Sequence, residues 1–361
     1  MKIYKAAIIG LGPSGLAVNK LIYGKKEDEV IAFENTNFKN RNNLFGFWLT
    51  DWMKPFEKLI KKKWHNWSIG NDFIKINHYE KNYPYCVISF DTWREYCLDN
   101  PNKIEIKIEK VLRYYPVKNY FKIITEDKRE YFAEKIYDSR SIKHKNNELI
   151  QHFFGINITT EDNKFHENEA TLMHFTQEES MLHFIYALPF SHNKALIEST
   201  VFSKEILTEN WYRNKIDKFL KNLNITKYEE NEIERGVIPM FSAEEKSANH
   251  PNIFNIGIRG GACKTSTGYA FSFLIKQILL LKKTNKNKVY VHNFIETEMD
   301  KIFIKYLKNF NENGKSFINL AKNLNGYEFQ SFMMGQSSLL TKIKIINSMP
   351  KMPFIMSIFK N

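Results

Sequence analysis

The 361-residue chain has few cysteines and no long hydrophobic run. Its three cysteines, Cys86, Cys97 and Cys263, are odd in number and lack metal-ligand spacing, so we expect reduced thiols, no metal site and a cytosolic protein. No stretch of about 18 uncharged apolar residues occurs, which excludes a bundle of membrane-spanning helices. Because the N-terminus enters a predicted strand at once, we expect no signal peptide.

Aromatic residues and lysine are abundant. The 29 Phe, 18 Tyr and 6 Trp exclude a disordered chain, and the length predicts two closely joined domains. The 53 Lys and Arg exceed the 40 Asp and Glu, giving a net charge of +13. This excess has two interpretations: a composition typical of AT-rich coding, or attraction to an anionic surface. We expect no nucleic-acid partner, because no recognition motif or basic helix is found.

A dinucleotide-binding motif opens the chain. Gly10-x-Gly12-x-x-Gly15 follows the apolar strand Lys5–Ile9 and precedes a helical pattern. In such motifs the glycines allow a tight turn, close approach of the pyrophosphate and close helix–sheet packing. Glu34 ends the next apolar strand, 19 residues beyond Gly15, where a carboxylate accepts hydrogen bonds from an adenosine ribose. A carboxylate here favours FAD or NAD over NADP.

Several segments in sequence order resemble flavoprotein-type lycopene cyclases. They include Ala195-Leu-Ile-Glu198-Ser-Thr and the second glycine-rich segment, Gly257-Ile-Arg-Gly260-Gly261. The full set comprises residues 149–155, 170–175, 184–190, 195–200, 234–240 and 257–269. Together they extend over most of residues 5–280.

The resemblance implies an α/β fold like that of the FAD-dependent hydroxylases. A Rossmann-type FAD-binding domain would carry an antiparallel-sheet substrate domain, which the successive strand patterns after residue 150 also predict. A helical region would follow at the C-terminus. The expected domain ranges are 1–75, 90–150 and 230–290 for FAD, 76–89 and 151–229 for substrate, and 291–361 for a helical tail.

The same resemblance implies closure of the ψ-ends of lycopene, a C40 carotenoid, into β-ionone rings. Reduced FAD would be required without net redox change, and NAD(P)H would serve only to reduce it. The sequence leaves open β or ε rings and closure of one or both ends. The alternative is an FAD-dependent monooxygenase or a prenyl-chain reductase. A carotenoid- or lipid-binding protein with a vestigial nucleotide fold is a third possibility.

Ring closure of a polyene needs an acid strong enough to protonate an alkene. A carboxylic acid that burial keeps protonated meets this need. Glu198 lies in an apolar strand on the same face as Leu196 and Thr200, and it matches the family position regarded as the acid–base residue. Glu234 is the second candidate, as a partner base or as a support for the turn near the flavin. The alternative for Glu198 is a strand-edge carboxylate paired with one of the many lysines. Glu232 lies on the same face as Glu234, and the alternative there is that one of these two carboxylates is simply solvated.

The remaining predicted site residues are expected to contact the cofactor. They are Gly10, Gly12, Ser14, Gly15, Glu34, Asp138, Gly257, Gly260 and Gly261. Asp138 is expected to end a strand beside the flavin. Arg259 could pair with the flavin phosphate or ring carbonyls, or it could point outward.

The segment Leu339–Phe359 is apolar and contains several lysines, a pattern typical of a helix lying on lipid. A terminal helix docked on the protein is the alternative. Because a C40 hydrocarbon dissolves only in membrane, we expect a membrane-surface partner. The predicted location is cytoplasmic and peripheral to the inner face of the cell membrane.

Overall fold

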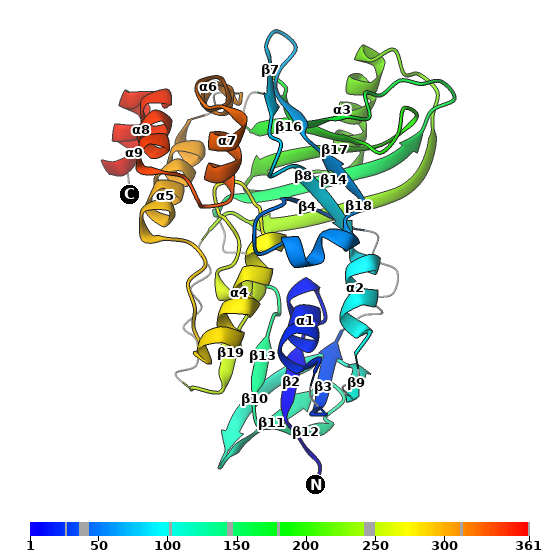
Figure 1. Cartoon of the computed structure of the whole chain (residues 1–361), viewed down its shortest axis with the longest axis vertical. Coiled ribbons are helices and arrows are strands. Elements are labelled where there is room, and N and C mark those ends of the chain that lie inside the picture. The colour runs from blue at the N-terminus through cyan, green and yellow to red at the C-terminus, as the bar shows by residue number, and fades with distance from the viewer. Residues whose placement is uncertain are drawn as a thin grey trace.

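The computed structural model describes residues 1–25, 27–35, 43–100, 103–142, 147–178, 181–241, 250–310 and 313–359. Its lower half in Figure 1 is a parallel sheet with helices on one face and a second sheet on the other. Its upper half is a large, mainly antiparallel sheet flanked by the C-terminal helices. The predicted α/β architecture is confirmed.

The parallel sheet is built around the predicted βαβ unit. Within the described residues its strand order is β19 (Ile253–Asn255), β13 (Ile136–Asp138), β2 (Ala6–Ile9), β3 (Glu29–Glu34) and β9 (Lys103–Ile108). Helix α1 (Pro13–Val18) and a π-helical turn (Asn19–Tyr23) join β2 to β3. Ile8 and Val30 are wholly buried, which fits the apolar strands of a sheet covered on both faces.

A smaller sheet covers the face of the parallel sheet away from α1. Its order is β1 (Ile3–Tyr4), β12 (Glu130–Ala133), β11 (Tyr120–Thr125) and β10 (Val111–Val117). Strands β11 and β12 form an antiparallel hairpin in which residues 121–124 pair with 130–133. Phe121 and Ile123 pack against Phe33 and Ile31 in a shared core.

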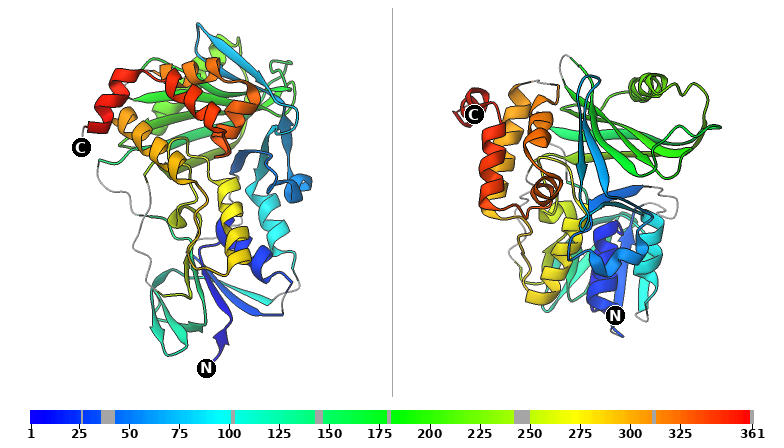
Figure 2. Two further views of the ribbon diagram at one scale, coloured as in Figure 1. Left: turned by 60° about the vertical axis from the view of Figure 1, so that its left-hand side comes forward. Right: turned by 45° about the horizontal axis from the view of Figure 1, so that its top comes forward.

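The large sheet carries the two predicted catalytic residues, Glu198 and Glu234. Among the described residues its order is β18 (Glu229–Pro239), β14 (Ile150–Thr159), β17 (Lys194–Ser203), β16 (Leu182–Pro189), β15 (Glu169–Phe175), β6 (Asn66–Gly70) and β7 (Lys75–Tyr79). Helix α3 (Glu209–Asn222) covers one face with Tyr212, Ile216 and Leu220. The other face is turned toward the parallel-sheet domain (Figure 2).

Sheet membership crosses the expected domain ranges at three points. Strand β18 lies almost wholly within 230–290 yet pairs with β14 of the large sheet. Strand β6 lies within 1–75 yet pairs with β15 of the large sheet. Strand β8 (Tyr85–Ser89) lies within 76–89 yet pairs with β4 (Leu44–Trp48) and β5 (Lys62–Trp64). This three-stranded connection lies between the two halves and carries Trp48, Trp64 and Tyr85 into the core.

Helices complete the molecule. Helix α2 (Phe90–Leu98) and α4 (Phe271–Thr284) pack beside α1, and short 3-10 helices span Lys54–Leu59 and Gly257–Gly260. The C-terminal helices are α5 (Phe294–Asn309), α6 (Lys315–Asn323), α7 (Gly326–Met333), α8 (Leu339–Ser348) and α9 (Lys351–Phe359). Phe317 of α6 packs against Phe175 of the large sheet. In the described residues, no helix combines the length and apolar character needed to cross a membrane.

Candidate active site

The glycine-rich loop lies between β2 and α1, as its sequence predicted. A side chain at Gly15 would put its Cβ 2.0 Å from the Gly10 carbonyl oxygen, so only glycine lets the helix start this close to the loop. A Cβ at Gly12 would meet nothing within 4 Å, and this residue lines a cavity. The loop therefore presents bare backbone to the cavity at Gly12, where a bulky ligand group can approach closely.

Glu34 ends β3 at the same cavity. Its Oε2 accepts a hydrogen bond from the Leu11 backbone N–H at 3.0 Å, and its Oε1 accepts one from the Asn35 N–H at 2.9 Å. A carboxylate oxygen can accept more than one hydrogen bond, including one from a ligand hydroxyl. The structure thus brings Gly10, Gly12, Ser14 and Glu34 together along one wall.

The second glycine-rich segment packs against the first. The Gly257 N–H donates to Gln277 Oε1 at 2.7 Å, and a Cβ at Gly257 would lie 2.3 Å from Ser14 Oγ. Gly257, Gly260 and Gly261 themselves do not line the cavity, and neither does Gly15. Ile258, Thr267 and Gly268 from the same part of the chain do line it.

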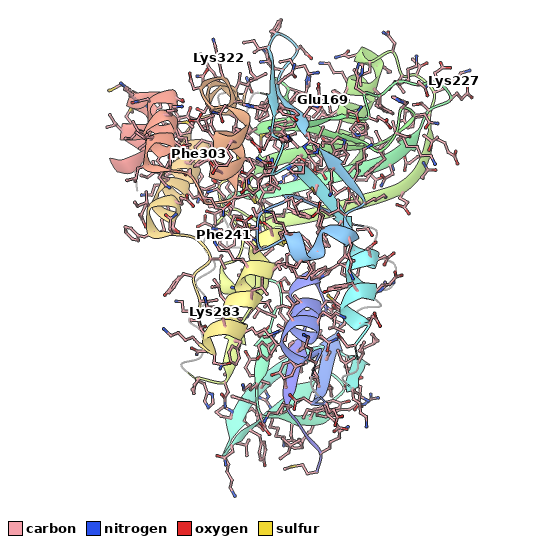
Figure 3. All side chains as sticks on the ribbon, viewed as in Figure 1. Glu169, Lys227, Phe241, Lys283, Phe303 and Lys322 are labelled. Atoms are coloured by element: carbon pink, nitrogen blue, oxygen red, sulfur yellow. The ribbon has the colours of Figure 1, made fainter. Side chains whose placement is uncertain are left out.

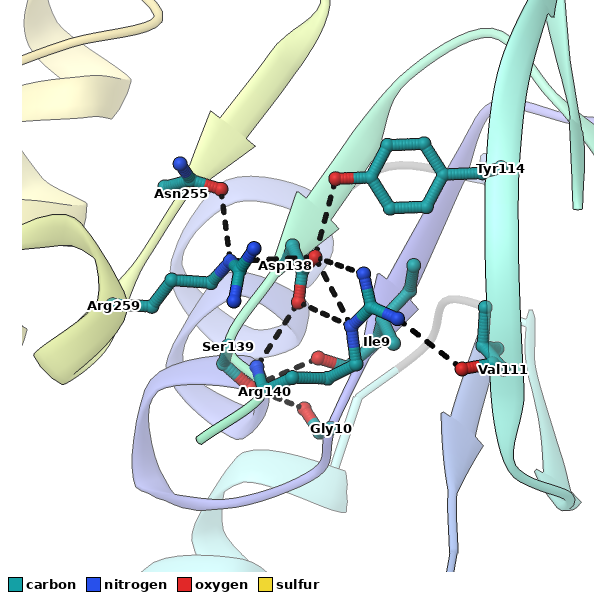
Figure 4. A network of polar contacts seen from close by, with 9 residues as sticks. All are labelled: Ile9, Gly10, Val111, Tyr114, Asp138, Ser139, Arg140, Asn255 and Arg259. Carbon is teal, nitrogen blue, oxygen red and sulfur yellow. Dashed lines mark hydrogen bonds and ion pairs between the residues drawn. The ribbon is translucent and has the colours of Figure 1, made fainter. Parts of the chain in front are cut away.

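Asp138 ends β13 and lies behind the cavity wall, which its neighbours Ser139 and Arg140 help to form (Figure 4). Its wholly buried carboxylate accepts hydrogen bonds from Arg140 Nη2 at 2.6 Å and from the Tyr114 hydroxyl at 3.1 Å. Arg259 Nε lies 3.4 Å from the same carboxylate and 3.2 Å from Asn255 Oδ1. Arg259 therefore does not point outward but pairs with Asp138.

One cavity of about 1220 Å³ joins the glycine loop to the large sheet. At the loop end it is lined by Gly10, Gly12 and Glu34, and at the sheet end by Glu198 and Glu234. Its wall at the junction of the two halves includes Phe241, which is labelled in Figure 3. The two sets of predicted residues therefore line the same cavity, one set from the glycine loop and β3 and the other from the large sheet.

The two glutamates flank a glycine on the central strand of their part of the sheet. Gly155 of β14 is opposite Glu198 of β17 on one side and opposite Glu234 of β18 on the other. A Cβ at Gly155 would lie 3.2 Å from Glu234 Cγ and 3.4 Å from Glu198 Cβ. Because Gly155 has no side chain, the two glutamates can approach each other across β14.

Burial gives both carboxyl groups an unusual affinity for protons. It raises the pKa of Glu198 to about 7, although the Thr200 hydroxyl, which donates to Oε1, has the opposite effect. Burial, followed by the charge of Glu198, raises the pKa of Glu234 to about 8. The Leu44 N–H donates to Glu234 Oε2 at 2.9 Å and partly offsets this shift. The surface that Glu198 retains faces the cavity, on the predicted face with Leu196 and Thr200.

Sequence reasoning missed the tyrosines beside this pair. Tyr186 of β16 is opposite Glu198 in the sheet, and its hydroxyl lies 2.8 Å from that of Tyr85. Tyr269 packs edge-on against Tyr85, with ring centroids 6.3 Å apart. Burial raises the pKa of all three hydroxyls, so they stay neutral. Strand alternation could have placed Tyr186 on the cavity face, whereas Tyr85 joins the site only through the tertiary fold.

Known structures share the whole fold at low sequence identity. A geranylgeranyl bacteriochlorophyll reductase-like protein from Thermoplasma acidophilum aligns with a TM-score of 0.61 and 12% identity, covering 96% of each chain. HpxO from Klebsiella pneumoniae, in complex with FAD and uric acid, gives a TM-score of 0.61 and 10% identity over 93% of this chain and 97% of its own. The flavin-dependent brominase Bmp2 aligns with a TM-score of 0.58 and 12% identity, covering 99% of this chain and 98% of its own. These likenesses establish the fold.

Sequence comparison supplies the family. No curated protein sequence matches the chain. The model of the lycopene cyclase protein family matches residues 6–355, which include the glycine loop, both glutamates and most of the C-terminal helices. The chain therefore belongs to the lycopene cyclase family.

Proposed function

We propose that this protein is an FAD-dependent lycopene β-cyclase, which closes the ψ-ends of lycopene into β-ionone rings without net redox change. One observation carries the proposal: two glutamates with raised pKa values, Glu198 and Glu234, lie on either side of Gly155 in a cavity that also includes the glycine loop. The reaction is an isomerisation, so the enzyme would be an intramolecular lyase or isomerase.

The cofactor proposal rests on the shape of the loop end of the cavity. Gly10, Gly12 and Ser14 would hold the pyrophosphate, and Glu34 would accept hydrogen bonds from the ribose. The open space at Gly12 fits a group that approaches the backbone closely. Bound FAD in its reduced form would supply an electron-rich ring near the reacting carbons. NAD(P)H is the proposed reductant for FAD.

The glutamate pair would supply and recover the proton. At neutral pH the pair retains a proton, because the pKa of Glu234 is raised to about 8 and that of Glu198 to about 7. We assign the acid role to Glu198, whose carboxyl would transfer this proton to the terminal double bond of lycopene, leaving a tertiary carbocation. The neighbouring double bond would then attack the cation and form the ring bond. Loss of a ring proton to the carboxylate pair would set the final double bond and restore the acid.

The wall of the cavity would protect the cation from water. Phe153, Leu196 and Tyr186 line it beside the carboxyls, and Tyr269 adds a further aromatic ring. Aromatic faces attract a cation without forming a bond to it. A neutral tyrosine is also a poorer trap for a carbocation than bulk water.

Expression in cells that accumulate lycopene tests this function. We expect β-carotene or γ-carotene in the extracted pigment, identified by chromatography, and no consumption of NAD(P)H per ring formed in the purified system. Unchanged lycopene would contradict the proposal. A hydroxylated or hydrogenated product formed with stoichiometric NAD(P)H oxidation would instead identify a monooxygenase or a prenyl-chain reductase.

A further inference from the structure

Helix α8 exposes its apolar side chains to solvent. Leu339, Leu340, Ile343 and Ile346 are each between 54% and 74% exposed. Their spacing of three and four residues places them along one side of the helix. A surface helix of a globular protein normally buries such a stripe against the core.

The opposite side of α8 buries polar groups. Thr341 and Lys342 face the protein. Lys342 Nζ donates to the Ser337 carbonyl oxygen at 2.6 Å and lies 3.2 Å from Glu296 Oε1 of α5. Ile345 is the apolar residue buried with them. The helix is therefore inverted: its charged side is anchored inside and its leucines and isoleucines face outward.

This anchor is tied to the wall of the cavity. Asp300 lies one helical turn beyond Glu296 on α5, and its Oδ1 accepts a hydrogen bond from Lys264 Nζ at 2.7 Å. The Lys264 N–H in turn donates to the Tyr269 carbonyl oxygen at 2.9 Å. Two buried ion pairs therefore hold α8 in a fixed position relative to the loop that carries Tyr269.

The charges around α8 select one kind of partner. Residues 313–361 contain six lysines and one acidic residue, Glu328. Lys344, which is ion-paired with Glu328, and Lys351 are exposed beside the apolar stripe, and the adjacent α9 exposes Met352, Ile355 and Met356. Helices α8 and α9 form one edge of the molecule, away from α3 (Figures 1 and 2). A second copy would bring like charges together, whereas an anionic bilayer offers both an apolar interior and a negative surface.

We propose that α8, with α9 beside it, docks the protein on an anionic lipid bilayer. The four apolar side chains of α8 enter the boundary of the acyl chains, and Lys344 and Lys351 lie among the headgroups. The proposal rests on the surface of α8 and holds whatever reaction the cavity performs. If the substrate is a carotenoid, docking brings the enzyme to the membrane in which that substrate is dissolved.

Sedimentation of the full-length protein with lipid vesicles tests the docking surface. The probes are vesicles of phosphatidylcholine alone and of phosphatidylcholine with phosphatidylglycerol. At low salt, we expect the protein to bind the anionic vesicles about tenfold more tightly than the vesicles of phosphatidylcholine alone. The double variant Leu340→Ser/Ile343→Ser should lower this binding at least tenfold, because two side chains no longer enter the lipid.

The matched control removes apolar side chains of similar exposure near α3. Ile206→Ser/Leu223→Ser should bind like the wild type, and circular dichroism should report the same fold for both variants. Equal binding by the two double variants would overturn the proposal. It would also be overturned if vesicles failed to bind and Leu340→Ser/Ile343→Ser converted a dimer into monomers, since a second copy would then cover α8.

Discussion

Two buried carboxylate sites near the same cavity differ in what surrounds them. Asp138 lies among cationic and hydroxyl partners, with Arg140, Arg259 and Tyr114 all directed at its oxygens. Glu198 and Glu234 lie instead on either side of Gly155, and within the described part of the chain neither forms an ion pair with a guanidinium group. Arg235 follows Glu234 in sequence but turns away, donating to Glu209 at 2.7 Å.

The comparison shows that burial alone does not decide the state of a carboxyl group. A buried carboxylate beside guanidinium groups has its charge balanced, so it can hold a structure together. A buried pair of carboxyls without such partners resists ionisation, and this raises the pKa of both Glu198 and Glu234. The first arrangement suits a structural role behind the cavity wall, and the second suits proton transfer.

The largest effect is expected at Glu198. Glu198→Gln should lower the rate of ring closure by about 10³-fold or more, because an amide cannot supply an acidic proton. Flavin content should stay at the wild-type level. Glu232→Gln, on an exposed position of β18 in the same sheet, provides a matched control that should keep full activity. A normal rate in Glu198→Gln would remove the assignment of this residue as the acid.

The effect of Asp138→Asn should appear in the stability of the protein. Loss of the carboxylate leaves Arg140 and Arg259 without their buried partner, so the free energy of unfolding should fall by about 3 kcal/mol. Urea denaturation measures this change. Glu209→Gln breaks two exposed ion pairs at the surface, with Arg213 and Arg235, and should change stability much less. Equal stability in the wild type and Asp138→Asn would show that the two carboxylate sites do not differ as described.

The glutamate pair should make stability depend on pH. Both groups have pKa values raised above the ordinary 4.5, to about 7 and about 8, so the folded protein holds protons that the unfolded chain releases. The wild type should therefore lose stability as the pH rises from about 4.5 to about 8. The double variant Glu198→Gln/Glu234→Gln does not titrate there, so its unfolding free energy should rise by several kcal/mol relative to that of the wild type over that range. Parallel pH profiles of the two unfolding free energies would contradict the raised pKa values.

The smallest effect is expected at the tyrosines. Tyr186→Phe keeps the ring beside Glu198 but removes the hydroxyl that lies 2.8 Å from the Tyr85 hydroxyl. Loss of one hydrogen bond should lower the rate by about fivefold, equivalent to about 1 kcal/mol. Tyr186→Leu should cost more if the aromatic face stabilises the cation, and steady-state rates of the two variants separate these contributions. Equal rates in Tyr186→Phe and Tyr186→Leu would show that the ring makes no contribution.

Local patterns predicted the residues whose roles depend on neighbours in sequence. Gly10, Gly12 and Glu34 follow from strand, turn and helix signals within one βαβ unit, and alternation placed Glu198 on its correct face. The strand order β18–β14–β17 was not available from the sequence, so the approach of Glu198 to Glu234 across Gly155 could not be foreseen. Arg259 reaches Asp138 from a segment more than 100 residues away. Such pairings arise from tertiary structure and leave no periodic signal.

The central claim is that a protonated Glu198 carboxyl drives the chemistry. Infrared difference spectroscopy can follow its protonated carboxyl band against pH, with Glu198→Gln identifying the band, while the initial rate of ring closure is recorded under the same conditions. We predict that band and rate decline together as the pH rises past about 7, and that both are absent in Glu198→Gln. A carboxyl already ionised at pH 5 in a fully active enzyme would contradict the account.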